Sequence, residues 1–224
     1  MDFAAIFQTW LNVLTKPSET TFELERQKPN ANFTTAIIWI IVAGAILAVL
    51  SAIGALISSF INGGGFTALQ PMLEETDIPP EVAAQLAAVT AGGAGGAVGT
   101  FCAGLIFIPI AFLIGSGVHF LIAKLFGGTG SFEEQTYLLA TFSAPIMIIN
   151  GIFSLVPVLG GCLSIFVFIY QLVLTYMAVK VAHRLGPGQA VVVALGPTLI
   201  FFTCIACLVV GIIAWITTMT ATAQ

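Results

Sequence analysis

The sequence predicts an all-α membrane protein with five transmembrane helices, preceded by an N-terminal amphipathic helix on the cytoplasmic surface. The hydrophobic fraction is 58% and the charged fraction 7%, whereas soluble domains carry about 25% charged residues. Five apolar segments are each long enough to cross a bilayer, which takes roughly 20 residues. All six Lys and Arg residues flank these segments on one side, as the positive-inside rule expects of cytoplasmic loops.

Residues 1–33 are predicted to form a cytoplasmic amphipathic segment. Its apolar residues recur at helical spacing and share one stripe: Phe3, Ile6, Phe7, Trp10, Leu11 and Leu14. The opposite face carries Asp2, Gln8, Thr9 and Asn12. This run is too short to span, so we expect a helix on the membrane surface with Trp10 at the interface. The alternative is a helix packed on cytoplasmic loops.

A short second helix is expected after Pro17, because Thr20 and Glu23 have the spacing of a capping box with Thr20 as N-cap. The five-span membrane domain then occupies residues 34–224. Its predicted spans are Thr34–Ile61, Ala97–Phe126, Gln135–Val156, Gly160–Arg184 and Ala190–Thr217. An outer loop at about 62–96 is acidic and contains no Lys or Arg. This asymmetry predicts a cytoplasmic N-terminus and an external C-terminus.

Small residues before and within the second span predict a helix-packing face. They are Gly92, Gly95, Gly96, Gly99, Ala103, Gly115 and Gly117. Small residues let two helix backbones approach closely in lipid, where apolar burial gives no drive for association. A phosphate-binding loop is disfavoured, because no Lys follows these glycines.

Few polar side chains lie inside the spans, and none is a carboxylate. Proton- and cation-coupled carriers usually place a carboxylate there, so this class is disfavoured. We expect Asn150 and Gln171 to form a hydrogen bond between the third and fourth spans. His119 is expected to be buried and to bond to a carbonyl freed by a helix proline or to Ser116. Catalysis by Ser116 and His119 is disfavoured, because no nucleophile-elbow motif surrounds them. Cys204 and Cys207 are interpreted as small packing residues, without metal-ligand partners.

The cytoplasmic edge of the second span carries the most specific motif. His119 is followed by Lys124-Leu125-Phe126-Gly127-Gly128-x-Gly130-Ser131-Phe132, then by Tyr137 and Pro145. This pattern, with Trp10-x-x-Val13-Leu14-Thr15-x-Pro17, Pro157 and Tyr170, resembles the bacterial branch of the Yip family of Ypt/Rab-interacting membrane proteins. The resemblance implies five spans, a cytoplasmic N-terminus and no enzymatic activity. It does not support small-GTPase binding, because the Asp-Leu-Tyr-Gly-Pro motif of eukaryotic relatives is missing here.

The first functional hypothesis is a non-enzymatic accessory or scaffold protein of a prokaryotic inner membrane. It would contact lipids and pack against other integral membrane proteins in a complex, with no cofactor and no nucleic acid. One alternative is a carrier or channel for a small neutral or hydrophobic molecule that uses Asn150 and Gln171. The other is a pigment- or haem-associated subunit with His119 and His183 as ligands.

Overall fold

A computed structural model describes residues 3–62, 94–156 and 159–222, and seven helices account for nearly all of this part. They are α1 (Phe3–Thr15), α2 (Glu19–Arg26), α3 (Phe33–Asn62), α6 (Ala94–Leu125), α7 (Phe132–Phe153), α8 (Leu159–His183) and α9 (Pro187–Thr222). Five of them, α3 and α6 to α9, are long and apolar enough to cross a membrane. The predicted all-α, five-span class is therefore confirmed. The predicted outer loop, including Gly92, lies largely outside the described residues.

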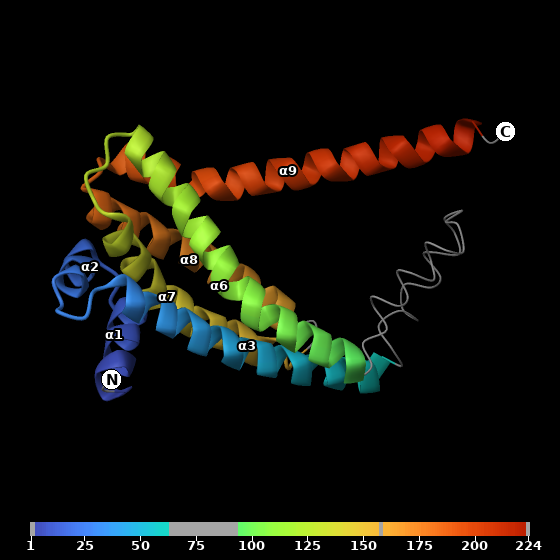
Figure 1. The fold of residues 1–224 in the computed structure, drawn as a ribbon, viewed down its shortest axis with the longest axis horizontal. Coiled ribbons are helices and arrows are strands. Elements are labelled where there is room, and N and C mark those ends of the chain that lie inside the picture. Colours follow the sequence, from blue (N-terminus) through green and yellow to red (C-terminus); the bar gives the residue numbers. More distant parts are fainter. Residues whose placement is uncertain (1–2, 63–93, 157–158, 223–224) are drawn as a thin grey trace.

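The helix α7 lies at the centre of the bundle. It packs between α3 and α8, while α6 lies along α3 (Figure 1). The first part of α9 packs against α8 and α6, and the rest of this helix runs away from the bundle (Figure 1). Within the bundle, neighbouring helices therefore cover α7 and leave most of α9 uncovered.

The core is richest in aromatic side chains where α1 and α2 meet the spans. Phe22 of α2 packs edge-on against Phe142 of α7, with ring centroids 6.2 Å apart. Trp39 of α3 contacts both Trp10 of α1, at 5.9 Å, and Tyr137 of α7, at 5.5 Å. Such pairs add to the free energy of apolar burial, so they hold the N-terminal segment on the membrane domain.

The N-terminal helices differ from the predictions in two details. Ser18, and not Thr20, is the N-cap of α2, because its hydroxyl accepts a hydrogen bond from the Thr21 backbone N–H. Thr9, expected on the polar face of α1, is buried and accepts a hydrogen bond from Lys28 Nζ at 2.8 Å. The reason is that the chain that follows α2, including Lys28, covers part of the polar face of α1.

Candidate functional site

One end of the bundle collects the N-termini of α3, α7 and α9 and the C-termini of α6 and α8 (Figure 1). We call it the basic end, because the six Lys and Arg residues lie in the helix ends and turns that gather there. The positive-inside interpretation requires such a common end. The basic end also holds the densest polar contacts, and it is the candidate functional site.

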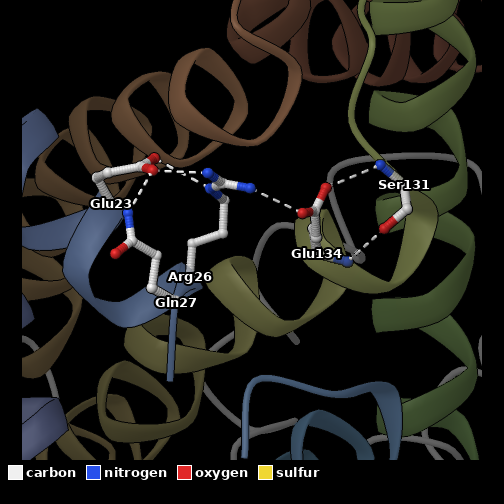
Figure 2. A network of polar contacts seen from close by, with 5 residues as sticks. All are labelled: Glu23, Arg26, Gln27, Ser131 and Glu134. Carbon is white, nitrogen blue, oxygen red and sulfur yellow. Dashed lines mark hydrogen bonds and ion pairs between the residues drawn. The ribbon is translucent and has the colours of Figure 1, made fainter. Parts of the chain in front are cut away.

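An ion-pair network clamps α2 onto α7 at the basic end (Figure 2). Arg26 binds Glu23 of its own helix with Nη2 to Oε1 at 2.6 Å, and Glu134 of α7 with Nη1 to Oε1 at 2.8 Å. Glu134 also closes a capping box with Ser131 at the start of α7. Hydrogen bonds from Arg26 and then Gln27 lower the pKa of Glu23 to about 2. Glu23 therefore stays ionised at any physiological pH.

Further contacts tie the N-terminal segment to the spans. Lys180 of α8 forms an ion pair with Glu19 of α2. The Tyr170 hydroxyl of α8 donates to the Leu14 carbonyl of α1 at 2.6 Å. These bonds reach both α1 and α2, so the N-terminal segment is part of the folded domain and not a separate arm.

A buried polar network joins α6, α7 and α8 just inside the basic end. Gln135 Nε2 donates to the Ser116 carbonyl at 2.7 Å, and His183 Nε2 donates to Gln135 Oε1 at 2.7 Å. The hydroxyls of Ser116 and Thr136 lie 2.9 Å apart. Each of these four side chains is buried. A buried polar group without a partner costs free energy, so the network specifies how the three helices meet.

The glycine-rich turn between α6 and α7 fits closely over the end of α8. Gly127 has a φ of 81°, which other residues rarely adopt. A Cβ on Gly130 would lie within hard contact of the Ala182 carbonyl, and one on Gly128 would lie 2.9 Å from His183 Nδ1. The motif at residues 127–130 is therefore explained by backbone packing, which only glycine permits.

The two histidines of the pigment hypothesis are engaged in local hydrogen bonds. His119 Nδ1 donates to the Gly115 carbonyl of its own helix at 2.7 Å, which is neither Ser116 nor a carbonyl that a helix proline frees. His183 bonds Gln135, and its other ring nitrogen faces the tight turn at Gly128. Within the described residues, no group of three or more His, Cys, Asp or Glu side chains could hold a metal ion.

Asn150 and Gln171 do not form the expected hydrogen bond. Asn150 Oδ1 is buried and has no partner among the residues that the structure describes, and the Gln171 backbone carbonyl accepts a hydrogen bond from the Thr175 hydroxyl of α8. The reason is register. Counting the same number of residues in both directions from the connection near residue 156 places Asn150 of α7 opposite about residue 162 of α8. Gln171 therefore lies roughly 13 Å further along α8.

At the positions of the predicted packing face of α6 whose surroundings the structure defines, no other helix of the described residues makes a close contact. Nothing lies within 4 Å of a Cβ built on Gly99, Gly115 or Gly117, and Ala103 is exposed. Gly95 and Gly96 lie in the first turn of α6. Contact of this face with a partner stays a prediction.

A different glycine of α6 makes the close contact with α3. A Cβ on Gly104 would lie 3.2 Å from Ala48 Cβ, and one on Gly44 would lie 3.1 Å from Ile108 Cγ2.

The two cysteines of α9 also differ from expectation, since Cys204 and Cys207 are exposed and free. Sequence alone identified small residues in these helices but not the face they occupy.

Two open grooves flank Arg184, which follows α8. One lies between α2 and the end of α8 and has a volume of about 500 Å³. The other lies beside the turn before α7 and has a volume of about 520 Å³.

Sequence reasoning missed Arg184, Gln135 and the ion-pair network that joins α2 to α7. The only available signal was the spacing of Ser131 and Glu134, which fits a capping box.

Comparison with known proteins agrees with the resemblance noted in the sequence. Residues 11–219 match the Yip1 domain. A search of curated proteins and a search of solved structures returned no match. The match begins inside α1 and ends near the end of α9, so it includes the later part of the N-terminal segment and all five apolar helices. The chain therefore belongs to the Yip1 domain family.

Proposed function

We propose that this protein is a non-enzymatic accessory or scaffold subunit of a prokaryotic cytoplasmic membrane, which packs against other integral membrane proteins. The observation that carries the proposal is the middle part of α9, where every residue from Leu199 to Ile212 is exposed. Lipid tolerates such a surface, and so does a partner helix. A helix exposed on all its faces is available to a partner without any rearrangement of its own bundle.

Three glycines of α6 that have open space beside them support the same proposal. Gly99, Gly115 and Gly117 leave open space where a side chain would be. Close backbone approach is a main source of helix association in lipid, and these positions offer it on the outside of the bundle. The ion-pair network at the basic end holds α2 against α7 and α8 and leaves the outer faces of α6 and α9 uncovered.

The test is the yield of partner complexes after purification in mild detergent. Gly99→Ile is expected to lower this yield, because a β-branched side chain holds helix backbones apart. Ile106→Leu is the matched control, since Ile106 lies exposed on the same helix and stays apolar. Equal yields from the two variants contradict the packing face, and failure to recover any partner contradicts the scaffold function.

The proposed orientation has its own test. With a cytoplasmic N-terminus, a reporter fused after Phe132 reports the cytoplasm, and one fused after Gln224 reports the exterior. Phe132 begins α7 at the basic end. Reporters in the same compartment exclude the proposed topology.

A further inference from the structure

Arg184 has an unusual backbone for its residue type. Its φ is 54°, the only positive φ of a non-glycine residue in the described chain. It follows the last residue of α8, and the Leu185 N–H donates to the Lys180 carbonyl at 3.1 Å. This is the bond pattern of a Schellman cap, where glycine usually occupies the left-handed position. Glycine would make the same turn without steric strain. The presence of an arginine here therefore indicates a role for its side chain.

The side chain of Arg184 is exposed and makes no hydrogen bond or ion pair among the described residues. The carboxylates around it already have partners. Glu19 is paired with Lys180, and Glu23 and Glu134 are both paired with Arg26. Arg184 therefore has free hydrogen-bond donors, and its charge adds to that of Arg26 in lowering the pKa of Glu23 and Glu134.

The Arg184 side chain lines the groove between α2 and the end of α8, together with apolar and polar side chains. Leu24, Val181 and Leu185 supply its apolar part, while Thr20, Lys180 and Arg184 supply hydrogen-bond donors. Its two carboxylates, both ion-paired, are balanced by its two cations. The groove on the other side of Arg184 is lined by two carboxylates and no other cation. An anion is therefore better accommodated on the α2 side.

The groove also lies where a lipid headgroup would be. The apolar span of α8 ends at His183, the residue before Arg184. Leu24, at the groove, is 62% exposed. Guanidinium binds phosphate with two parallel hydrogen bonds, and Lys and Arg side chains near the cytoplasmic surface attract anionic headgroups. We propose that the groove between α2 and the end of α8 binds the phosphate of an anionic phospholipid headgroup, with Arg184 as its main donor.

This site is independent of the scaffold function, so either proposal can fail alone. The test measures binding of dioctanoyl phosphatidylglycerol to the purified full chain in a neutral detergent. Arg184→Gly and Arg184→Asn, which both suit the left-handed backbone, are expected to weaken binding about tenfold. Arg184→Lys is expected to fall between them and the wild type. Lys16→Gln is the matched control, because it removes an exposed cation near the basic end and outside the groove.

A stability measurement separates binding from folding. Arg184→Gly is expected to melt at or above the wild-type temperature, because glycine relieves the strain while binding is lost. Unchanged lipid affinity in Arg184→Gly would overturn the proposal, as would an equal loss in Lys16→Gln. Displacement of the lipid by equimolar inorganic phosphate would assign a free-anion site instead. Tighter binding of an acidic peptide at the same groove would assign it to a protein partner and overturn the lipid proposal.

Discussion

α7 and α9 are both apolar enough to span a membrane, yet they differ in their burial. In the apolar stretch of α7, 67% of residues are buried, against 11% in that of α9. α7 is nevertheless the less apolar of the two. Its first half carries Gln135, Thr136, Thr141 and Ser143, all buried.

The difference shows that polar residues, more than apolar ones, decide which helix is central in lipid. An apolar side chain loses nothing by facing lipid, whereas a polar one needs a partner inside the protein. Gln135 of α7 finds such partners on α6 and α8. The exposed half of α9 has Thr203, whose hydroxyl bonds back to Leu199 of the same helix. The least apolar span is therefore central, and the exposed half of α9 needs no neighbour.

The largest expected contrast between the two helices comes from removing a phenyl ring. Phe142→Ala on α7 is expected to cost about 3–5 kcal/mol, because Phe142 is fully buried and leaves a cavity. Phe201→Ala on α9 removes a ring that is 61% exposed and is expected to change stability by less than about 0.5 kcal/mol. Thermal unfolding in detergent measures both. Similar losses would mean that the outer half of α9 is packed after all.

Adding volume gives a second contrast. A Cβ on Gly151 of α7 would lie 2.9 Å from Leu50 Cδ1, so Gly151→Ile is expected to destabilise by about 1–3 kcal/mol. Gly211 of α9 has nothing within 4 Å of that position, so Gly211→Ile is expected to be tolerated. The comparison fails if both variants unfold at the same temperature.

Removing a polar partner tests why α7 is central. Gln135→Leu leaves His183 Nε2 unpaired in the interior and removes the bond from Gln135 to the Ser116 carbonyl, at an expected cost of about 1–3 kcal/mol. Thr203→Val on α9 removes one exposed local hydrogen bond and is expected to be nearly neutral. A neutral Gln135→Leu would show that apolar packing alone centres α7.

The smallest expected effect is on the clamp that joins α2 to α7. The pKa of Glu23 is lowered to about 2 from the ordinary 4.5. A lowered pKa stabilises the folded state fully above pH 4.5, and this contribution is lost as pH falls toward 2. Because the pair is solvent-exposed, its contribution is expected to stay below about 1 kcal/mol.

Hydrogen exchange of α2 between pH 7 and pH 3 measures this effect, after correction for the intrinsic pH dependence of exchange. Protection is expected to be constant down to about pH 4.5 and to fall below it. Glu23→Gln is expected to show the lower protection already at pH 7. If the pH dependence persists in Glu23→Gln, another carboxylate controls the docking of α2.

By itself, the sequence determined the five helices, their approximate ends and the common side of the Lys and Arg residues. These properties depend on local composition and on the length needed to cross a bilayer. The glycine-rich turn was also visible as a motif, although its cause was not. Gly128 and Gly130 are required by the end of α8, which is about 50 residues away in the chain.

Only the tertiary structure decided which helix is central and which polar residues meet. Asn150 and Gln171 were paired by type, but the register of α7 and α8 separates them. Gln135 and His183 were not paired in advance, because their contact depends on how the turn at residues 127–130 seats α7 against α8. The composition of a helix limits which surroundings it tolerates, lipid or protein. The register and rotation of neighbouring helices decide which side chains meet, because hydrogen bonds and close packing act over only a few ångströms.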